Sequence, residues 1–369
     1  MQQRYYALDV FRGATVALMI LVNNPGSWAY MYPPLQHAKW HGCTPTDLVF
    51  PFFLFAVGNA MAFVMPKFEK AGSTHFLKKL SKRALLIFLI GLLLNWSPFV
   101  KWQADDLVFK NWENVRILGV LQRIAICYFF AGLIVFYGKR RGAILISIVL
   151  LLTYWVASAF LGNPAAPYSL QGFFGTAIDL SIIGETHLYK GEGVPFDPEG
   201  LMSSTAAIVQ VIIGYLAGKY IIEKGKTAEM LAGIFVGGSL LLLGGFVWDY
   251  LFPINKKIWT SSYTIYTAGL AMLCLGLCIY LLEFNNQKGR MSEFFNVFGK
   301  NSLFIFVLSG VLPRLIGLIR FNEVLADGST TYNTPLSILY KQICVPLSND
   351  QRVGSFVYAL LFSQKLNKF

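Results

Sequence analysis

The chain has 369 residues, of which 55% are hydrophobic and only 14% carry a charge. Because a soluble domain of ordinary composition has about 25% charged residues, this composition excludes an ordinary soluble protein. The formal net charge is +12, but the basic residues cluster in short segments between apolar runs. That arrangement is typical of membrane topology signals and argues against a groove for nucleic acid.

Apolar runs long enough to cross a bilayer recur along the whole sequence. They predict an all-α fold, a polytopic transmembrane helical bundle of about ten spans, with residues 1–369 forming one integral-membrane domain. The first run contains Asp9 and Arg12 and has no cleavage pattern, so we expect no cleavable signal peptide. The expected spans are 5–23, 46–65, 83–100, 116–137, 142–161, 200–222, 228–252, 260–283, 300–319 and a last segment that begins near Val353.

Some stretches depart from a plain membrane span. Asn95 and Pro98 interrupt the third predicted span near its outer end, where a helix can stop without exposing its backbone to lipid. Residues 332–347 are only moderately apolar and contain two prolines, so we expect an interfacial or re-entrant helix there. The last segment, 353–363, is shorter than the ~20 residues that a crossing needs, so it is either a partial span or an early end.

Positively charged residues are unevenly divided between alternate loops. Segment 66–83 carries six lysines and arginines and 139–141 reads Lys-Arg-Arg, whereas the long segment 162–199 contains Lys190 alone. Lysine and arginine favour the cytoplasmic side of a membrane. We therefore expect the N-terminus in the cytoplasm, and the loop with His37 together with segment 162–199 on the outer side.

A short stretch near the N-terminus concentrates groups that can do chemistry. It contains His37 and His41, two of the four histidines in the chain, and Asp47 at the start of the next apolar run. A histidine near a carboxylate at the mouth of an apolar segment is typical of an acid–base or acyl-accepting centre. The alternative is an interfacial loop, with its tryptophans and tyrosines at headgroup level and its histidines merely solvated.

Several polar side chains fall inside predicted spans, where a charge costs about 2.5–3.5 kcal/mol on insertion scales. Asp9 and Arg12 share a helix face at i, i+3, so they form either a local ion pair or a polar entry for an anionic ligand. Arg123 lies well inside the span 116–137, with Gln122 beside it. We expect Arg123 to line an interior cavity and to hold a carboxylate or phosphate.

Two outer segments carry candidate substrate contacts. Asp197 and Glu199 come just before a predicted helix, so they either cap that helix or recognise a hydroxylated or amine-bearing substrate. Trp259 and Tyr263 follow the next outer turn. They suit an interfacial aromatic belt or a sugar-stacking surface, and the sequence does not choose between the two.

The five cysteines do not suggest a metal site. Cys274 and Cys278 are spaced i, i+4 in an apolar run, and no histidine follows them in the sequence. We therefore expect both to be buried as small hydrophobic residues, and we expect no metal.

Seven sequence blocks, in the same order, resemble one family. The chain resembles the heparan-alpha-glucosaminide N-acetyltransferase family, with its bacterial relatives of the DUF5009 type, from Leu8 to about Ser309. Each block alone is a weak signal, whereas seven in order are specific. The blocks are Leu8–Gly13, Leu21–Asn23, His37–Gly42, Thr46–Pro51, Arg116–Arg123, Phe196–Gly200 and Asn255–Trp259.

The resemblance implies a transmembrane N-acetyltransferase that moves acetyl from cytosolic acetyl-CoA to the amino group of a glucosamine-type sugar on the outer side of the membrane. It implies that His37 is the acetyl acceptor or general base, with Asp47 and Asn23 as its catalytic partners. It also implies a multi-pass protein of a bacterial cytoplasmic membrane, with acetyl-CoA as cosubstrate, a homodimer as the expected assembly and no nucleic-acid partner.

The remaining candidate residues divide between the two substrates. His41 is outside the family pattern and receives no role. Lys82 and Arg83, on the predicted cytoplasmic side, could attract the phosphates of CoA together with Arg12. The candidate cosubstrate contacts are Asp9, Arg12, Arg116, Gln122 and Arg123. The candidate acceptor contacts are Trp40, Asp197, Glu199, Asn255, Lys256 and Trp259.

Two other classes of protein compete with the enzyme. The main alternative is a membrane transporter for an amino sugar such as N-acetylglucosamine, because intramembrane charges also mark transport paths. Transporters usually show internal repeats, and the sequence shows none, which favours the enzyme. The density of polar residues in the spans argues against a non-catalytic scaffold. Two departures from the family concern the loop between Asn23 and His37, which looks longer, and the C-terminus, which looks shorter.

Overall fold

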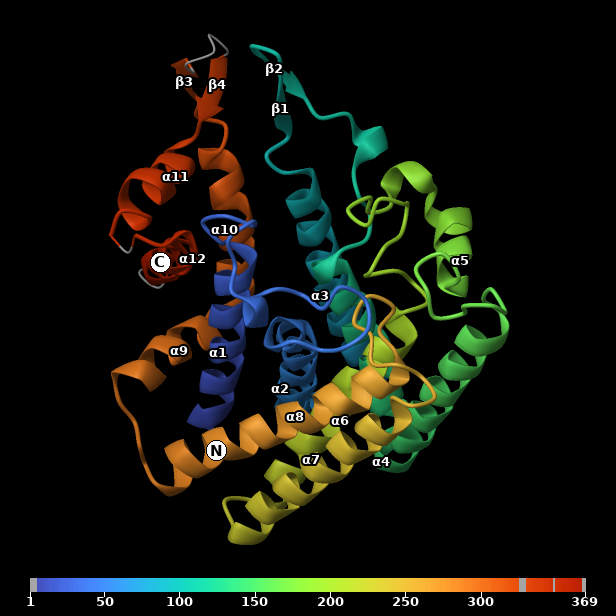
Figure 1. Cartoon of the computed structure of the whole chain (residues 1–369). Helices are drawn as coiled ribbons and strands as arrows, with labels where there is room; N and C mark the ends of the chain where they lie inside the picture. Colours follow the sequence, from blue (N-terminus) through green and yellow to red (C-terminus); the bar gives the residue numbers. More distant parts are fainter. Residues whose placement is uncertain (1–4, 325–329, 348, 367–369) are drawn as a thin grey trace.

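A computed structural model describes residues 5–324, 330–347 and 349–366, and helices dominate this part of the chain (Figure 1). The predicted all-α class is confirmed, although two short β-hairpins were not predicted. The strands are β1 Val100–Gln103, β2 Asp106–Phe109, β3 Phe321–Val324 and β4 Thr330–Asn333. The helices are α1 Tyr6–Asn23, α2 Val49–Ala71, α3 Ser73–Trp96, α4 Val120–Phe160, α5 Phe174–Ile183, α6 Ser204–Lys224, α7 Ala228–Trp248, α8 Ser261–Ile279, α9 Arg290–Lys300, α10 Ser302–Ile316, α11 Pro335–Ile338 and α12 Gln351–Leu366.

The helices confirm a multi-pass membrane protein. Six of those that the structure describes are long and apolar enough to cross a membrane, and the bent pair α9 and α10 makes a seventh if it counts as one span. The predicted count of about ten is therefore not confirmed. One reason is that α9 and α10 meet at 84°, so the predicted span 300–319 is the second arm of a broken element. Another is that α12, at 16 residues, is short for a crossing.

Two predicted spans, 116–137 and 142–161, lie in one helical element of 41 residues, α4. The backbone leaves helical geometry at Lys139, with φ 52° and ψ −159°, within the basic turn that the sequence indicated. This element begins at Val120, later than predicted, so Arg116 lies in an irregular segment before the helix. A side chain on this irregular segment can point into a site at the mouth of the bundle.

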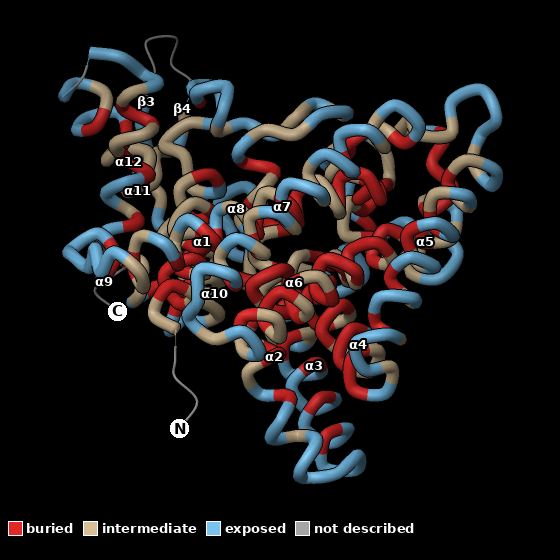
Figure 2. Tube along the Cα trace, turned by 90° about the horizontal axis from the view of Figure 1, so that it is seen from below, coloured by how far each residue is buried: buried red, intermediate tan, exposed pale blue. Residues whose placement is uncertain are grey.

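The centre of the bundle is the crossing of α2 and α6, where buried residues are concentrated (Figure 2). A Cβ on Gly214 would lie 2.1 Å from the carbonyl oxygen of Phe55, and one on Gly218 would lie 2.8 Å from that of Asn59. Small residues at such crossings let membrane helices approach closely. Because contacts advance in the same direction along both helices, α2 and α6 are parallel. The segments that precede them therefore meet at one end of the bundle.

The two β-hairpins lie at the same end of the molecule (Figure 1). Pro98 follows the end of α3, as expected for an interrupted span, and the chain then enters the first hairpin. Trp102 Nε1 donates to the carbonyl oxygen of Leu318 at 3.0 Å, and the hydroxyl of Tyr332 donates to Asp105 Oδ1 at 2.8 Å. These bonds tie the C-terminal end of α3 to the C-terminal region of the chain. Residues 335–344 form one short helix, α-helical over Pro335–Ile338 and π-helical over Leu339–Cys344.

One prediction about α8 is wrong. Cys274 is exposed and Cys278 is half-buried, although both were expected to be buried. The run around them is apolar on every face, so the sequence did not reveal which face meets other helices and which faces outward.

Candidate active site

His37 and Asp47 are in direct contact at the mouth of α2. His37 Nδ1 lies 2.7 Å from Asp47 Oδ1, and the carboxylate is almost completely buried while the imidazole is half exposed. A carboxylate at this distance accepts the Nδ1 proton and so leaves the lone pair on Nε2. The imidazole therefore presents a basic nitrogen on its exposed side.

The second oxygen of Asp47 is fully used in fixing the loop. Oδ2 accepts from the backbone N–H groups of Ala38 and Thr44 and from the Thr44 hydroxyl, at 3.0 Å each. These bonds close the capping box of the 3-10 turn Pro45–Leu48, which leads into α2. The Tyr263 hydroxyl of α8 donates to the backbone carbonyl of Asp47 at 2.5 Å. Ala38 and Thr44 thus fix the carboxylate that orients His37, and Tyr263 fixes the backbone of the same residue.

Lys256 completes a group of three charged or titratable side chains. Its Nζ lies 3.0 Å from His37 Nδ1, 3.4 Å from His37 Nε2 and 3.4 Å from Asp47 Oδ1. Burial lowers the pKa of the Lys256 ammonium below its ordinary value, while Asp47 and then Glu199 oppose that shift. A cation thus lies against the imidazole of His37, somewhat closer to Nδ1 than to Nε2.

Asn255 holds the turn that presents Lys256. Its Oδ1 accepts from the backbone N–H of Lys257 at 2.7 Å and from that of Ile258 at 3.1 Å. The residue is completely buried, so its side chain supports the turn from behind the cavity. Trp259 follows in the left-handed region with φ 49°, and its ring forms part of the wall.

Arg116 joins the two carboxylates of the outer loop. Its guanidinium donates from Nε to Asp197 Oδ2 at 2.9 Å and from Nη2 to Asp197 Oδ1 at 2.5 Å, and it also forms an ion pair with Glu199. Burial by itself would raise the pKa of Glu199, but the nearby cations, with Arg116 first among them, together hold it below its ordinary value. Asp197 is completely buried at the back of this cluster, whereas Glu199 faces the cavity. Both carboxylates therefore bind an arginine rather than only capping α6.

These groups surround a cavity of about 290 Å³. Three further residues with polar side chains also line it, none of them among the predicted site residues: Tyr189, Glu192 and Lys257. Lys257 Nζ lies 2.6 Å from Glu192 Oε2, and the Arg116 guanidinium lies over the ring of Tyr189. Tyr189 and Glu192 lie in the irregular segment between α5 and α6, which gave no periodic signal, whereas Lys257 belongs to the block Asn255–Trp259 and was not singled out there. The predicted residues on the wall are Asn23, His37, Trp40, Asp47, Arg116, Glu199, Lys256 and Trp259.

Two further cavities extend this site into the bundle. One of about 150 Å³ shares five wall residues with the first, namely Asn23, His37, Val120, Glu199 and Lys256. Another, of about 220 Å³, shares Phe53 and Ile124 with the second, is otherwise mostly apolar, and reaches Arg12 and Arg83. The three cavities form a series that begins beside His37 and ends beside two arginines.

Arg123 is completely buried and lies behind the wall formed by Trp259. Its Nη2 donates to the carbonyl oxygen of Gly200 at 3.1 Å and to the Ser203 hydroxyl, and its guanidinium lies over the Trp259 ring at 5.1 Å. These partners are neutral, and Nε and Nη1 of Arg123 have no hydrogen-bond partner among the described residues, so the expected contact with a carboxylate or phosphate stays a prediction. Through its two hydrogen bonds, Arg123 fixes the segment that carries Glu199.

The remaining predicted cosubstrate residues lie away from His37. Gln122 is buried in the contact between α3 and α4, where a Cβ on Gly91 would come 2.6 Å from its Oε1. Asp9 and Arg12 form the local ion pair at 2.7 Å, and Arg12 Nε also donates to the carbonyl oxygen of Gly299 at 2.7 Å. Arg12 is the member of this pair that borders the third cavity.

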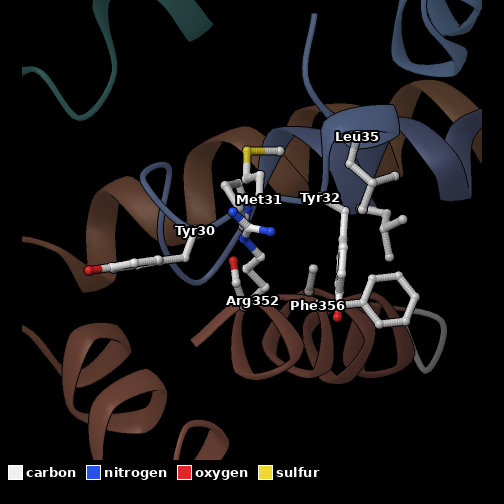
Figure 3. A pocket seen from close by; sticks show the side chains of 10 residues that line it. Tyr30, Met31, Tyr32, Leu35, Arg352 and Phe356 are labelled. Carbon is white, nitrogen blue, oxygen red and sulfur yellow. The ribbon is translucent and has the colours of Figure 1, made fainter. Parts of the chain in front are cut away.

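The loop between α1 and His37 rests on α12. The backbone N–H of Ser27 donates to Ser355 Oγ at 3.1 Å, and the ring of Tyr32 meets that of Phe356 edge-on at 6.5 Å (Figure 3). The space between them is only about 10 Å³, which has room for about one water molecule. This contact therefore anchors the loop that leads to His37 and is too small to be a substrate site.

Two neighbouring groups are poorly suited to the chemistry. Burial raises the pKa of Cys43 to about 12, so the thiol stays protonated and is a weak nucleophile. Burial also lowers the pKa of His41 below its ordinary value. Its nearest polar partner is the side-chain amide of Asn255, whose Nδ2 lies 3.5 Å from His41 Nδ1, so it lacks the orienting carboxylate that His37 has.

The chain is similar in sequence to known proteins of one family. The catalytic-domain model of heparan-alpha-glucosaminide N-acetyltransferase matches residues 4–174. The human heparan-alpha-glucosaminide N-acetyltransferase is 27% identical over 362 residues, which cover 82% of this chain and 52% of the human protein. The mouse protein of the same name is 27% identical over 364 residues, covering 84% of this chain and 54% of its own length. The chain thus spans about half the length of the curated relatives it matches.

Fold and site together define a multi-pass membrane protein with a histidine–carboxylate pair at the mouth of a helical bundle. In sequence it is similar to the heparan-alpha-glucosaminide N-acetyltransferase family, the resemblance that the order of its motifs indicated.

Proposed function

We propose that this chain is an N-acetyltransferase that moves acetyl from cytosolic acetyl-CoA to the amino group of a glucosamine-type sugar. The reaction would take place at a multi-pass protein of a bacterial cytoplasmic membrane, with the N-terminus in the cytoplasm and the acceptor on the outer side. The expected homodimer remains part of this proposal. Support comes from the family and from the charge distribution of the loops.

The observation that carries the proposal is the position of His37. It lies in the wall of the outer cavity and also in the wall of the cavity that leads inward. A donor that reaches up the inner series and an acceptor in the outer cavity would meet at this imidazole. Two substrates held on either side of one base is the arrangement that proximity catalysis requires.

The inner series of cavities suits the donor. Its mostly apolar middle fits the uncharged arm of CoA, and its far end is bordered by Arg12 and Arg83, whose guanidinium groups suit phosphate. The outer cavity suits an amino sugar, because Trp40 and Tyr189 offer rings for stacking and Glu192 and Glu199 offer acceptors for hydroxyl and amine groups.

In the proposed reaction, His37 acts as a general base in a direct transfer. Its Nε2 takes a proton from the acceptor amine as the nitrogen bonds to the thioester carbon and the carbonyl electron pair moves onto oxygen. When that pair returns, the carbon–sulfur bond breaks, and the sulfur leaves with the proton from His37. The products are the acetamide and free CoA. Asp47 holds the imidazole in the required tautomer throughout, and Asn23 lies on the shared wall as a donor to the substrate oxygen.

Purified protein in vesicles, supplied with labelled acetyl-CoA and glucosamine, tests this function. We expect labelled N-acetylglucosamine and an equal amount of free CoA, and we expect no release of CoA before the acceptor is added. Release of one CoA per protein in the absence of acceptor would replace direct transfer with an acetyl-histidine. Passage of N-acetylglucosamine across the vesicle without any acetyl transfer would overturn the enzyme in favour of a transporter.

A further inference from the structure

The position of Lys256 relative to His37 has a chemical use beyond contact with the acceptor. Its Nζ lies 3.0 Å from His37 Nδ1 and 3.4 Å from Nε2, the nitrogen that Asp47 leaves unprotonated. Lys256 also lines both the outer cavity and the one below it. Of the family residues at this site, it is the one that brings a positive charge to the junction where the two substrates would meet. A fixed cation at this point faces the atoms whose charge changes during transfer.

We propose that Lys256 is a catalytic cation that stabilises the oxyanion formed on the acetyl group during transfer, an assignment that rests on the proposed function. The bond between the acceptor nitrogen and the thioester carbon forms beside His37 Nε2, so the carbonyl oxygen lies within a few ångströms of that nitrogen. As the carbonyl electron pair moves onto this oxygen, the ammonium of Lys256 donates to it. The pair returns when the carbon–sulfur bond breaks, and Lys256 keeps its proton throughout.

The hydrogen bonds of Asp47 leave Lys256 free to act in this way. Asp47 Oδ2 is occupied by Ala38 and Thr44, and its Oδ1 is bound more closely by His37, at 2.7 Å, than by Lys256, at 3.4 Å. An ammonium carries three donors, so a loose contact with Asp47 leaves others directed at the cavity. Lys256 is therefore held near His37, and its contact with Asp47 does not use all of its hydrogen-bond donors.

The charge on Lys256 is tied to pH by its surroundings. The groups that face it are His37 and Asp47, then Glu199 across the cavity and Cys43 on the adjoining loop. Burial lowers its pKa from the ordinary value, so the ammonium is lost at a lower pH than for a lysine in water. Because the proposed step needs the ammonium, activity should fall as pH rises through this lowered pKa.

The test uses Lys256→Met, which keeps the length of the side chain, and Lys256→Arg, which keeps its charge. We expect Lys256→Met to lower kcat by roughly 10²-fold, the cost of removing one donor to an oxyanion, with acetyl-CoA binding unchanged. Lys256→Arg should keep part of the activity and move the alkaline limb of the pH profile upward, since arginine does not lose its proton in this range. Lys39→Gln, a change at an exposed lysine of the same loop as His37, is the matched control.

A double-substitution cycle with Asp47→Asn separates direct action from an effect through the histidine. If Lys256 stabilises the oxyanion itself, the losses from Lys256→Met and Asp47→Asn multiply. If Lys256 only positions the Asp47–His37 pair, Lys256→Met costs nothing further in the Asp47→Asn background, and the inference is overturned. An alkaline limb that stays in place in Lys256→Arg also overturns it.

The wild-type protein separates this inference from the proposed function. If the wild type transfers no acetyl, both the proposed function and the inference are overturned. If the wild type is active and the Lys256 variants are as active as the wild type, the inference alone is overturned.

Discussion

The backbone N–H of Gly42 donates to the carbonyl oxygen of Ile254 at 2.7 Å. This bond ties the loop that carries His37 to the turn that carries Lys256, although the two segments lie far apart in the sequence. Gly42 adopts φ +105°, a conformation that residues with a Cβ rarely adopt. The relative position of the two site residues therefore depends on backbone pairing as well as on the side-chain contacts around Asp47.

Asp47→Asn should lower acetyl transfer less than loss of His37 itself but more than His41→Ala. The amide keeps the size of the carboxylate and can still accept from Ala38 and Thr44, but it no longer selects the tautomer with the proton on His37 Nδ1. Turnover of the purified variant measures this effect, with acetyl-CoA binding as the control for folding. Equal rates for Asp47→Asn and the wild type would show that the contact does not orient the base.

Arg116→Gln should destabilise the protein by about 3–5 kcal/mol, because it leaves the buried Asp197 and the nearby Glu199 without their cation. Arg116→Lys should cost less but should still lose the two-pronged contact. The pKa of Glu199 is held below its ordinary value, so its stabilising effect is complete above that value and is lost as pH falls through the lowered pKa.

Unfolding in detergent measures the Arg116 effect, and a triple variant provides its control. Replacing Asp197 and Glu199 by their amides in the Arg116→Gln background removes the unpaired charges and should recover much of the lost stability. A loss of less than about 1 kcal/mol in Arg116→Gln alone would mean that the cluster behaves as an exposed ion pair.

Arg123→Leu should lower both stability and acetyl transfer, whereas Arg123→Lys should keep part of each. The leucine cannot donate to Gly200 and Ser203, so the segment that holds Glu199 at the cavity is freed. Loss of hydrogen bonds from a charged donor costs about 1.5–3 kcal/mol. Thermal unfolding and turnover are the measurements, and wild-type values for both in Arg123→Leu would contradict the positioning role.

The sequence predicted the contact chemistry of the site better than its architecture. The spacing of His37 and Asp47 indicated a pair because a short loop can return to the start of the next helix. The ion pair of Asp9 and Arg12 followed from helical spacing alone. Both are local relationships, for which the distance along the chain nearly determines the distance in space.

The relationships that sequence could not supply are long-range. Arg116 was taken as a residue inside a span that contacts the cosubstrate, but α4 begins after it, and its partners Asp197 and Glu199 come from another loop. Arg123 was expected to hold an anion, and the sequence did not reveal its contacts with the Trp259 ring, the Gly200 carbonyl and the Ser203 hydroxyl. Hydropathy also predicted more spans than the described helices support, because the hydropathy of a segment does not indicate where a helix bends.

The proposed orientation predicts which thiols are reachable from outside. In a cysteine-free variant, a single cysteine at the exposed position of Thr74 should resist an impermeant thiol reagent in intact cells, because the basic segment 66–83 should be cytoplasmic. A single cysteine at the exposed position of Lys190 should react readily. The opposite pattern would invert the topology and place the His37 cavity on the side of the donor.

Acetyl transfer by the His37→Ala variant tests the central claim most directly. The assay follows labelled acetyl from acetyl-CoA to glucosamine in purified wild-type, His37→Ala and His41→Ala proteins, with acetyl-CoA binding measured on the same samples. Removal of a general base costs about 10²–10⁴-fold in rate, so His37→Ala should lose at least that much while still binding acetyl-CoA, and His41→Ala should lose far less. Turnover near the wild-type rate in His37→Ala would contradict the catalytic role of His37 and would favour the transporter instead.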